Sequence, residues 1–132
     1  WFLPKIVGIS KALDLTFSGR IIESQEALDI SLISSIHKPE NLIDDAIHIA
    51  QELVEKSAPI SIAITRQMLW RSFGQTHPYD AHVIESKAID SRGASDDAKE
   101  GVNSFLEKRS AKFKNLISSD MPDFFPWWEE RD

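Results

Sequence analysis

An aromatic residue and four cations stand close together near the end of the last helical pattern in the chain. Phe105 is followed by Lys108, Arg109, Lys112 and Lys114. Residues three apart are neighbours on a helix surface, so Phe105 and Lys108 can act together. An aromatic face can stack on a base while cations meet phosphates, as a nucleotide-bearing cofactor requires. On the pattern alone, a core phenylalanine followed by a charged helix end is the stronger interpretation, and the nucleotide site is the alternative.

Histidines offer a second candidate, a metal site. His77 and His82 are five residues apart, whereas two ligands on one helix face need a spacing of three or four. We therefore interpret this segment as a polar helix end with one satisfied histidine, and we assign no metal ligand.

Paired acids could perform acid–base chemistry if burial or mutual repulsion separated their pKa values. The pair Asp96-Asp97 suits the positive end of a helix dipole, and the pair Asp44-Asp45 suits a solvated helix face. No carboxylate is expected on an apolar face. We accordingly assign no catalytic residue in this sequence.

Several classes of function are excluded by what the sequence lacks. It has no cysteine, so disulfides, thiolate nucleophiles and cysteine-ligated metals are absent. Its five glycines are scattered and form no phosphate-binding loop, and no nucleophile-elbow motif occurs. Fifteen basic against 21 acidic residues give a net charge of −6, which disfavours nucleic-acid binding. No apolar run approaches the roughly 18 residues that a membrane span needs.

The 132 residues have ordinary globular composition, with 42% hydrophobic and 27% charged residues. The opening Trp1-Phe2-Leu3-Pro4 is typical of mid-chain sequence and lacks the features of a signal peptide. We expect a piece of a longer protein, located in the cytoplasm.

Hydrophobic periodicity predicts helices through most of the chain. Ser10 and Gly19 frame the first, and Ser95 is a natural cap for the last. The segment Ile33–Ile36 is the one plausible strand, with no partner in the chain. The expected fold is all-α, with five or six helices and at most one short orphan strand. The expected helices are Lys11–Ser18, Gln25–Ile30, Glu40–Lys56, Pro59–Phe73, Pro78–Arg92 and a segment from Asp96 to about Arg109.

The final segment, Ser118–Asp132, is acidic, and two prolines forbid a regular element there. It nevertheless carries a third of the chain's aromatic residues, which would make a free tail adhesive. We therefore expect it to lie against another surface, its own or a partner's. The aromatic residues are Phe124, Phe125, Trp127 and Trp128.

Several motifs resemble the second half of the crotonase (enoyl-CoA hydratase/isomerase) superfamily, and together they cover residues 1–114. The closing sequence resembles an extension found in one branch of that family. One departure is Ser31, which stands where many members carry a glycine. The motifs are Trp1–Gly8, Ser18–Ile22, Glu26–Leu28, Leu32–Ile36, Ala94–Val102 and Ser104–Arg109.

This resemblance implies a CoA-thioester enzyme whose N-terminal half holds a ββα spiral, an oxyanion hole and one or two catalytic glutamates. Those parts would lie upstream of Trp1, so the present chain alone should be inactive. It also implies that the family's C-terminal helices cover the acyl pocket and assemble the subunits. Phe105 and Lys108 match positions that contact the adenine and the 3′-phosphate of CoA, sometimes across a subunit boundary.

The same resemblance implies no tightly bound cofactor, because coenzyme A enters as part of the acyl-CoA substrate. It implies a homo-oligomer, a trimer or dimer of trimers in the intact protein, without nucleic-acid or membrane partners. We expect residues 1–39 to end the crotonase core, 40–114 to form the helical lid and oligomerisation region, and 115–132 to form an acidic, aromatic extension.

Two alternatives stay open. The chain could be a helical protein-interaction module without chemistry, using the apolar faces of Glu40–Lys56 and Pro59–Phe73. It could also belong to a crotonase with another reaction, such as thioester hydrolysis, decarboxylation or dehalogenation.

Overall fold

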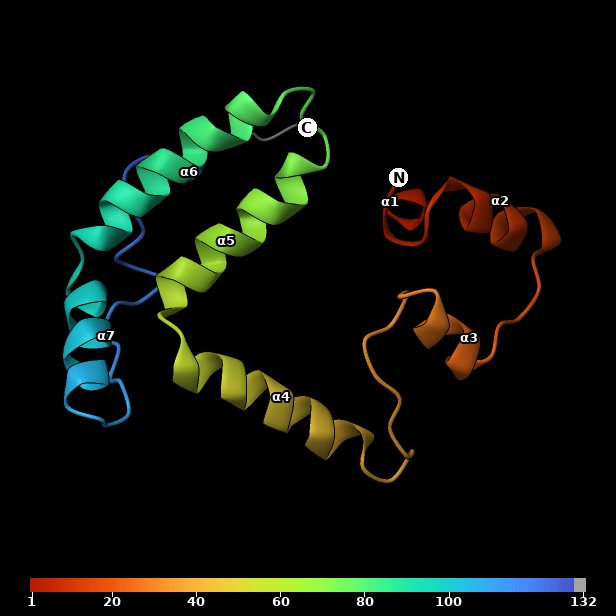
Figure 1. Cartoon of the computed structure of the whole chain (residues 1–132), viewed down its shortest axis with the longest axis horizontal. Helices are drawn as coiled ribbons and strands as arrows, with labels where there is room; N and C mark the ends of the chain where they lie inside the picture. The colour runs from red at the N-terminus through yellow and green to blue at the C-terminus, as the bar shows by residue number, and fades with distance from the viewer. Residues whose placement is uncertain (130–132) are drawn as a thin grey trace. The chain divides into compact units, whose positions relative to one another are not determined.

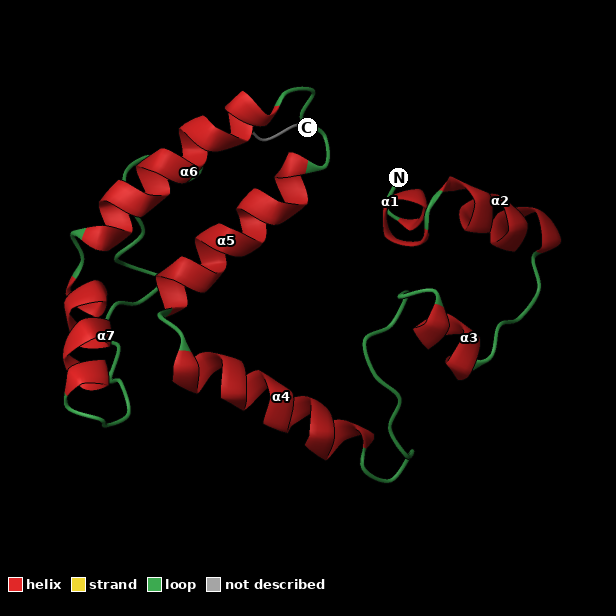
Figure 2. Cartoon of the chain, viewed as in Figure 1, coloured by secondary structure: helices red, strands yellow, loops and turns green. Residues whose placement is uncertain are grey.

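The computed structural model describes residues 1–129, and this part of the chain is all-α (Figure 1). Its elements confirm the predicted fold class, with one more helix than expected, the short α1. No strand forms among the described residues (Figure 2). The helices are α1 (Leu3–Val7), α2 (Ile9–Ser18), α3 (Ser24–Asp29), α4 (Leu42–Lys56), α5 (Pro59–Ser72), α6 (Pro78–Gly93) and α7 (Asp96–Leu106).

The chain divides into two compact units, Trp1–Ile47 and a second that begins at His48. In the first unit α1 contacts α2, and Gly19 ends α2 at φ 60°, as its predicted cap role requires. Arg20 then joins α2 to α3, because its guanidinium donates to Glu26 at 2.5 and 2.7 Å and to Asp14 at 3.3 Å. The hydrogen bond from Arg20 is the main reason why the pKa of Glu26 is lowered.

The segment Ile33–Ile36, predicted as a strand, is an irregular loop between α3 and α4 (Figure 2). A strand needs a neighbour to take its ladder hydrogen bonds, and this segment has none among the described residues. The turn before it keeps a left-handed residue even without glycine, since Ser31 has φ 59°. Ser31 N donates to Leu28 O and Leu32 N to Ala27 O, both at 2.9 Å, which is a Schellman motif.

The second unit is built on an antiparallel pair, α5 and α6, with α7 contacting α6 (Figure 1). Its buried core consists of Ile60 and Ile64 from α5 and Ala88 from α6, with exposed fractions of 0, 1 and 5%. The expectation that the aromatic tail lies against another surface is confirmed, and the surface is its own α5–α6 pair. The partly buried side chains packed on this core are Met68, Met121, Phe124, Phe125 and Trp127.

Other apolar side chains of α5 and α6 lie outside this core. Leu69 and Ile89 are 64% and 66% exposed. Helix α7 also ends at Leu106, three residues earlier than expected, because Lys108 leaves the helical conformation.

Helix α4 is amphipathic but buries none of its residues. Its exposed apolar side chains include Ile49, Leu53 and Val54, with exposed fractions of 45, 59 and 66%. A helix with such a stripe normally covers another surface. Within residues 1–129, no helix has the length and apolar character to cross a membrane.

Candidate functional site

Helix α7 begins with a well-formed cap and an unexpectedly buried acid. Ser95 Oγ accepts a hydrogen bond from Ala98 N at 3.2 Å, as predicted for an N-cap. Asp97, expected to be an exposed dipole partner, is only 3% exposed. Its Oδ1 accepts from the backbone N–H groups of Lys114 and Asn115 at 3.0 and 3.3 Å. The acid therefore fastens the segment after the helix to its first turn.

The other end of α7 closes in a second Schellman motif. Lys108 N donates to Phe105 O at 3.2 Å, and Arg109 N donates to Ser104 O at 3.0 Å. The residue at the left-handed position is Lys108, with φ 53°. Glycine usually fills such a position, since a side chain there costs roughly 1–2 kcal/mol. The backbone of Lys108 is thus fixed in a sharp turn by hydrogen bonds on both sides.

Phe105 does not belong to the core of this chain. Its side chain is 81% exposed, which overturns the interpretation favoured by the sequence pattern alone. An exposed phenyl ring next to a lysine turn is a surface on which a flat, charged ligand can bind.

The four cations after Phe105 do not form one phosphate site. Arg109 is held by carboxylates: Nη1 and Nη2 donate to Glu100 at 2.5 and 2.9 Å, and Nε donates to Glu107 at 2.6 Å. These bonds raise the pKa of Arg109, with the Glu100 contact contributing most. The same guanidinium is the largest cause that lowers the pKa of Glu100 to about 2.

Lys108, Lys112 and Lys114 make no ion pair with a carboxylate in the described part of the chain, and all three residues are exposed. The backbone N–H of Lys112 donates to Glu100 Oε1 at 2.7 Å, which fixes the path of this segment. Arg109 therefore has a structural role, whereas the three lysines are available to bind a ligand.

The histidine segment behaves as a helix end. His77 Nδ1 accepts from Tyr79 N at 3.1 Å and caps α6, which agrees with the satisfied histidine predicted from its spacing. Among residues 1–129, no group of histidine and acidic side chains is arranged to hold a metal ion.

The sequence pattern did not predict one chain of hydrogen-bonded side chains in the first unit. Ser35 Oγ lies 2.7 Å from His37 Nε2, and His37 Nδ1 lies 2.7 Å from Asp45 Oδ2. This connectivity is that of a serine nucleophile, but acyl transfer also needs positioned donors for the oxyanion. Ser35 is exposed on a loop. We interpret the chain of hydrogen bonds as the link that fastens the loop to the first turn of α4.

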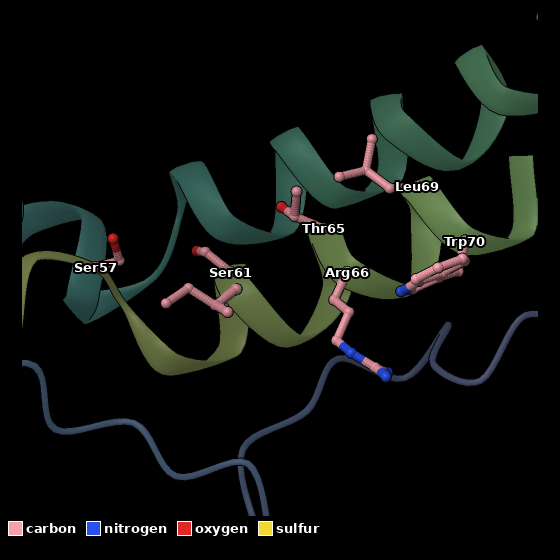
Figure 3. Close-up of a pocket in the computed structure, with 7 residues that line it drawn as sticks. Ser57, Ser61, Thr65, Arg66, Leu69 and Trp70 are labelled. Carbon is pink, nitrogen blue, oxygen red and sulfur yellow. The ribbon is translucent and has the colours of Figure 1, made fainter. Parts of the chain in front are cut away.

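An open groove of about 450 Å³ runs along α5 (Figure 3). Its polar groups begin at Ser57, and those on α5 alone are spread from Ser61 to Trp70, roughly 14 Å along the helix axis. They are too far apart to converge on one small ligand, so we assign no site to this groove. The lining residues are Ser57, Ser61, Ile62, Thr65, Arg66, Leu69 and Trp70.

The helical fold and the exposed Phe105–Lys108 turn can be compared with known proteins. Residues 1–116 match the enoyl-CoA hydratase/isomerase family, and the chain belongs to this family. The residues that carry this assignment include all of α7 and its closing turn. The aromatic tail from Ile117 onward lies outside the match.

Individual relatives agree with this assignment. The chain is 39% identical over 114 residues to a probable enoyl-CoA hydratase of Bacillus subtilis, covering 85% of this chain and 43% of that protein. It is 33% identical over 113 residues to a mitochondrial enoyl-CoA hydratase of Pongo abelii, covering 86% and 38%. The chain thus spans about two fifths of the length of these relatives.

Solved structures show the same arrangement. An enoyl-CoA hydratase of Bacillus anthracis is similar with a TM-score of 0.79 at 27% identity, over 85% of this chain and 43% of that one. A probable enoyl-CoA hydratase/isomerase of Mycobacterium abscessus reaches a TM-score of 0.83 over 88% and 45%. At 24% identity, the second likeness concerns the fold alone.

Proposed function

We propose that this chain supplies the CoA-contacting, pocket-covering and subunit-assembly part of an enoyl-CoA hydratase/isomerase that acts on acyl-CoA thioesters. Family membership supports the substrate class. The observation that carries the site is the 81% exposure of Phe105 beside the left-handed Lys108. The bare apolar face of α4 supports a role in covering or assembly.

In this proposal Phe105 stacks on the adenine of CoA and the ammonium of Lys108 meets the 3′-phosphate. Stacking needs an accessible ring face, and a phosphate contact needs a cation that is not neutralised by a neighbouring acid. Both requirements are met on this surface. No tightly bound cofactor is involved, because CoA is part of the substrate.

The reaction itself is assigned to the part of the relatives that this chain does not span. That part would provide the oxyanion hole and the catalytic glutamates. Removing a single oxyanion donor costs about 10²–10³ in rate. The 132-residue chain by itself should therefore not hydrate crotonyl-CoA.

The test is equilibrium binding of acetyl-CoA and of 3′-dephospho-acetyl-CoA to the full-length gene product. Lys108→Asn removes the charge with a residue that tolerates the left-handed conformation. It should weaken acetyl-CoA about fivefold, the upper range for an exposed ion contact, and leave the dephospho ligand unchanged. The matched control, Lys112→Asn, removes one charge from the neighbouring segment and should have a smaller effect. Equal affinity of wild type and Lys108→Asn for acetyl-CoA would refute the assignment.

The same measurement separates the alternatives. A helical interaction module, which the exposed face of α4 would also suit, predicts no CoA binding at all. Another crotonase reaction predicts the same CoA contacts but a different product, for example free thiol from thioester hydrolysis. Product analysis with the full-length protein distinguishes these reactions.

A further inference from the structure

Two acids on α7 hold the segment that follows the helix. We call residues 109–115 the strap. Asp97 accepts from the strap's N–H groups at Lys114 and Asn115, and Glu100 accepts from the N–H of Lys112 and from the guanidinium of Arg109. The two acids are three residues apart, so they lie on the same side of α7. The strap therefore lies along the helix, held at both ends.

Packing of Phe113, which lies between the hydrogen-bonded Lys112 and Lys114, supports the same arrangement. A Cβ placed on Gly101 would lie 3.9 Å from Cε1 of Phe113, an ordinary contact distance. The Phe113 ring thus lies next to the one residue of α7 without a side chain. The strap is docked by an apolar contact as well as by hydrogen bonds.

The position of Lys108 depends on this docking. Lys108 is the residue directly before the strap, in a conformation that a lysine adopts only when its surroundings enforce it. Arg109 is fixed on its other side by Glu100, through two hydrogen bonds at 2.5 and 2.9 Å. Loss of this anchor would allow the turn to relax and Lys108 to change its position relative to Phe105.

We propose that Glu100 is a positioning residue for the CoA 3′-phosphate: by anchoring Arg109 and the strap, it holds Lys108 beside Phe105. This inference rests on the proposed CoA-binding function. Glu100 touches no ligand in this scheme and acts through Arg109.

Simple electrostatics and a positioning role predict opposite effects of Glu100→Gln on the affinity for acetyl-CoA. Removal of a negative charge near a phosphate site should strengthen phosphate binding through Coulomb attraction alone. Loss of the anchor should instead weaken it. Asp96→Asn is the matched control, because Asp96 is an acid of the same helix that pairs with Lys99 and interacts with the strap only through the charge of Lys114.

The experiment measures acetyl-CoA and 3′-dephospho-acetyl-CoA binding to the full-length gene product carrying these substitutions. Glu100→Gln should weaken acetyl-CoA about two- to fivefold and leave the dephospho ligand unchanged, because only an exposed ion contact is lost. In the Lys108→Asn background, Glu100→Gln should cause no further loss of acetyl-CoA affinity, because the contact between Lys108 and the 3′-phosphate is already absent. Asp96→Asn should leave both affinities as in wild type or slightly raise them.

The outcomes are distinguishable. If Lys108→Asn has no effect, the proposed CoA site itself fails. If Lys108→Asn weakens binding but Glu100→Gln does not, only the positioning role is overturned. An equal loss for both ligands would show a general structural defect and would also overturn it. Should Glu100→Gln fold poorly by circular dichroism, Arg109→Lys tests the same anchor, because it keeps the charge but loses the two-pronged contact.

Discussion

The guanidinium of Arg71 lies over the indole ring of Trp128, 3.4 Å from the ring centroid. This contact joins the last turn of α5 to a tail that lies outside the segment shared with the family. Cation–π contacts contribute about 0.5–1 kcal/mol at exposed sites and more when desolvated. The tail is therefore part of the second unit's fold and extends the core formed by α5 and α6.

Trp127 tests the contribution of this tail to stability. It packs against the core of Ile60, Ile64 and Ala88, so Trp127→Ala should lower the free energy of unfolding of the chain. We expect a loss of roughly 2–3 kcal/mol, below the 3–5 kcal/mol of a fully buried ring. Urea denaturation followed by circular dichroism measures it. Phe105→Ala, at an 81% exposed ring, is the control and should change little. A similar loss for both variants would contradict the role of the tail.

Ser31 tests the strain in the turn after α3. A serine at φ 59° adopts a conformation that glycine reaches freely. Ser31→Gly should raise the free energy of unfolding by about 0.5–1 kcal/mol, since relief of strain exceeds the added freedom of the unfolded chain. The thermal midpoint of the chain reports it.

The control for this prediction is Ser34→Gly, three residues further along the same loop and not in the left-handed region. It gains no relief from strain and should leave stability unchanged or lower it. If both glycine variants raise the midpoint equally, the left-handed turn is not the cause.

Glu100 gives a pH-dependent signature. Its pKa is lowered from the ordinary 4.5 to about 2, first by the Arg109 hydrogen bonds and next by the Lys112 N–H. A lowered folded-state pKa means that the stabilising effect is fully present above about pH 4.5. It is lost as the pH falls from there toward 2. Docking of the strap on α7 should therefore weaken only in this acid range.

The measurement for Glu100 is its carboxyl ¹³C shift as a function of pH. Wild type should titrate near 2, and Arg109→Met should move the midpoint upward toward the ordinary value by removing the main cause. A wild-type midpoint near 4.5 would show that the anchor does not form in solution.

Local signals explain which features of the fold could be predicted. The helix ends at Gly19 and Ser95 depend on the conformation and hydrogen bonding of a few adjacent residues, so the sequence contains the needed information. The turn at Ser31 was indicated only by the family resemblance, in which many members carry a glycine at this position. Amphipathic spacing identified α4 over nearly its whole length.

Features that depend on distant residues could not be predicted. Asp97 is buried and accepts hydrogen bonds from Lys114 and Asn115, which lie 17 and 18 positions further along the chain. No local sequence pattern indicates these contacts. Phe105 has the spacing of a core residue, but it is 81% exposed and no surface within residues 1–129 covers it. Arg109 could not be separated from the other cations because its partner, Glu100, lies more than two helical turns earlier.

The bare face of α4 leads to the last prediction. Ile49 and Leu53 lie at the centre of its apolar stripe and are 45% and 59% exposed. Water-exposed stripes of this kind favour association, at about 25 cal/mol for each Å² of apolar surface removed from water. The 132-residue chain should therefore self-associate as its concentration rises, and Ile49→Glu with Leu53→Glu should reduce this association. Sedimentation velocity over a range of concentrations measures both.

The added negative charges could also reduce self-association by repulsion between two copies of the chain. The control therefore adds an acid on the opposite side of the same helix. Gln51→Glu introduces a carboxylate about half a turn away from the apolar stripe. It should leave self-association intact, because it does not interrupt the apolar contact. A chain that sediments as a monomer at all concentrations, or equal dissociation by Gln51→Glu, would show that the α4 face does not drive association.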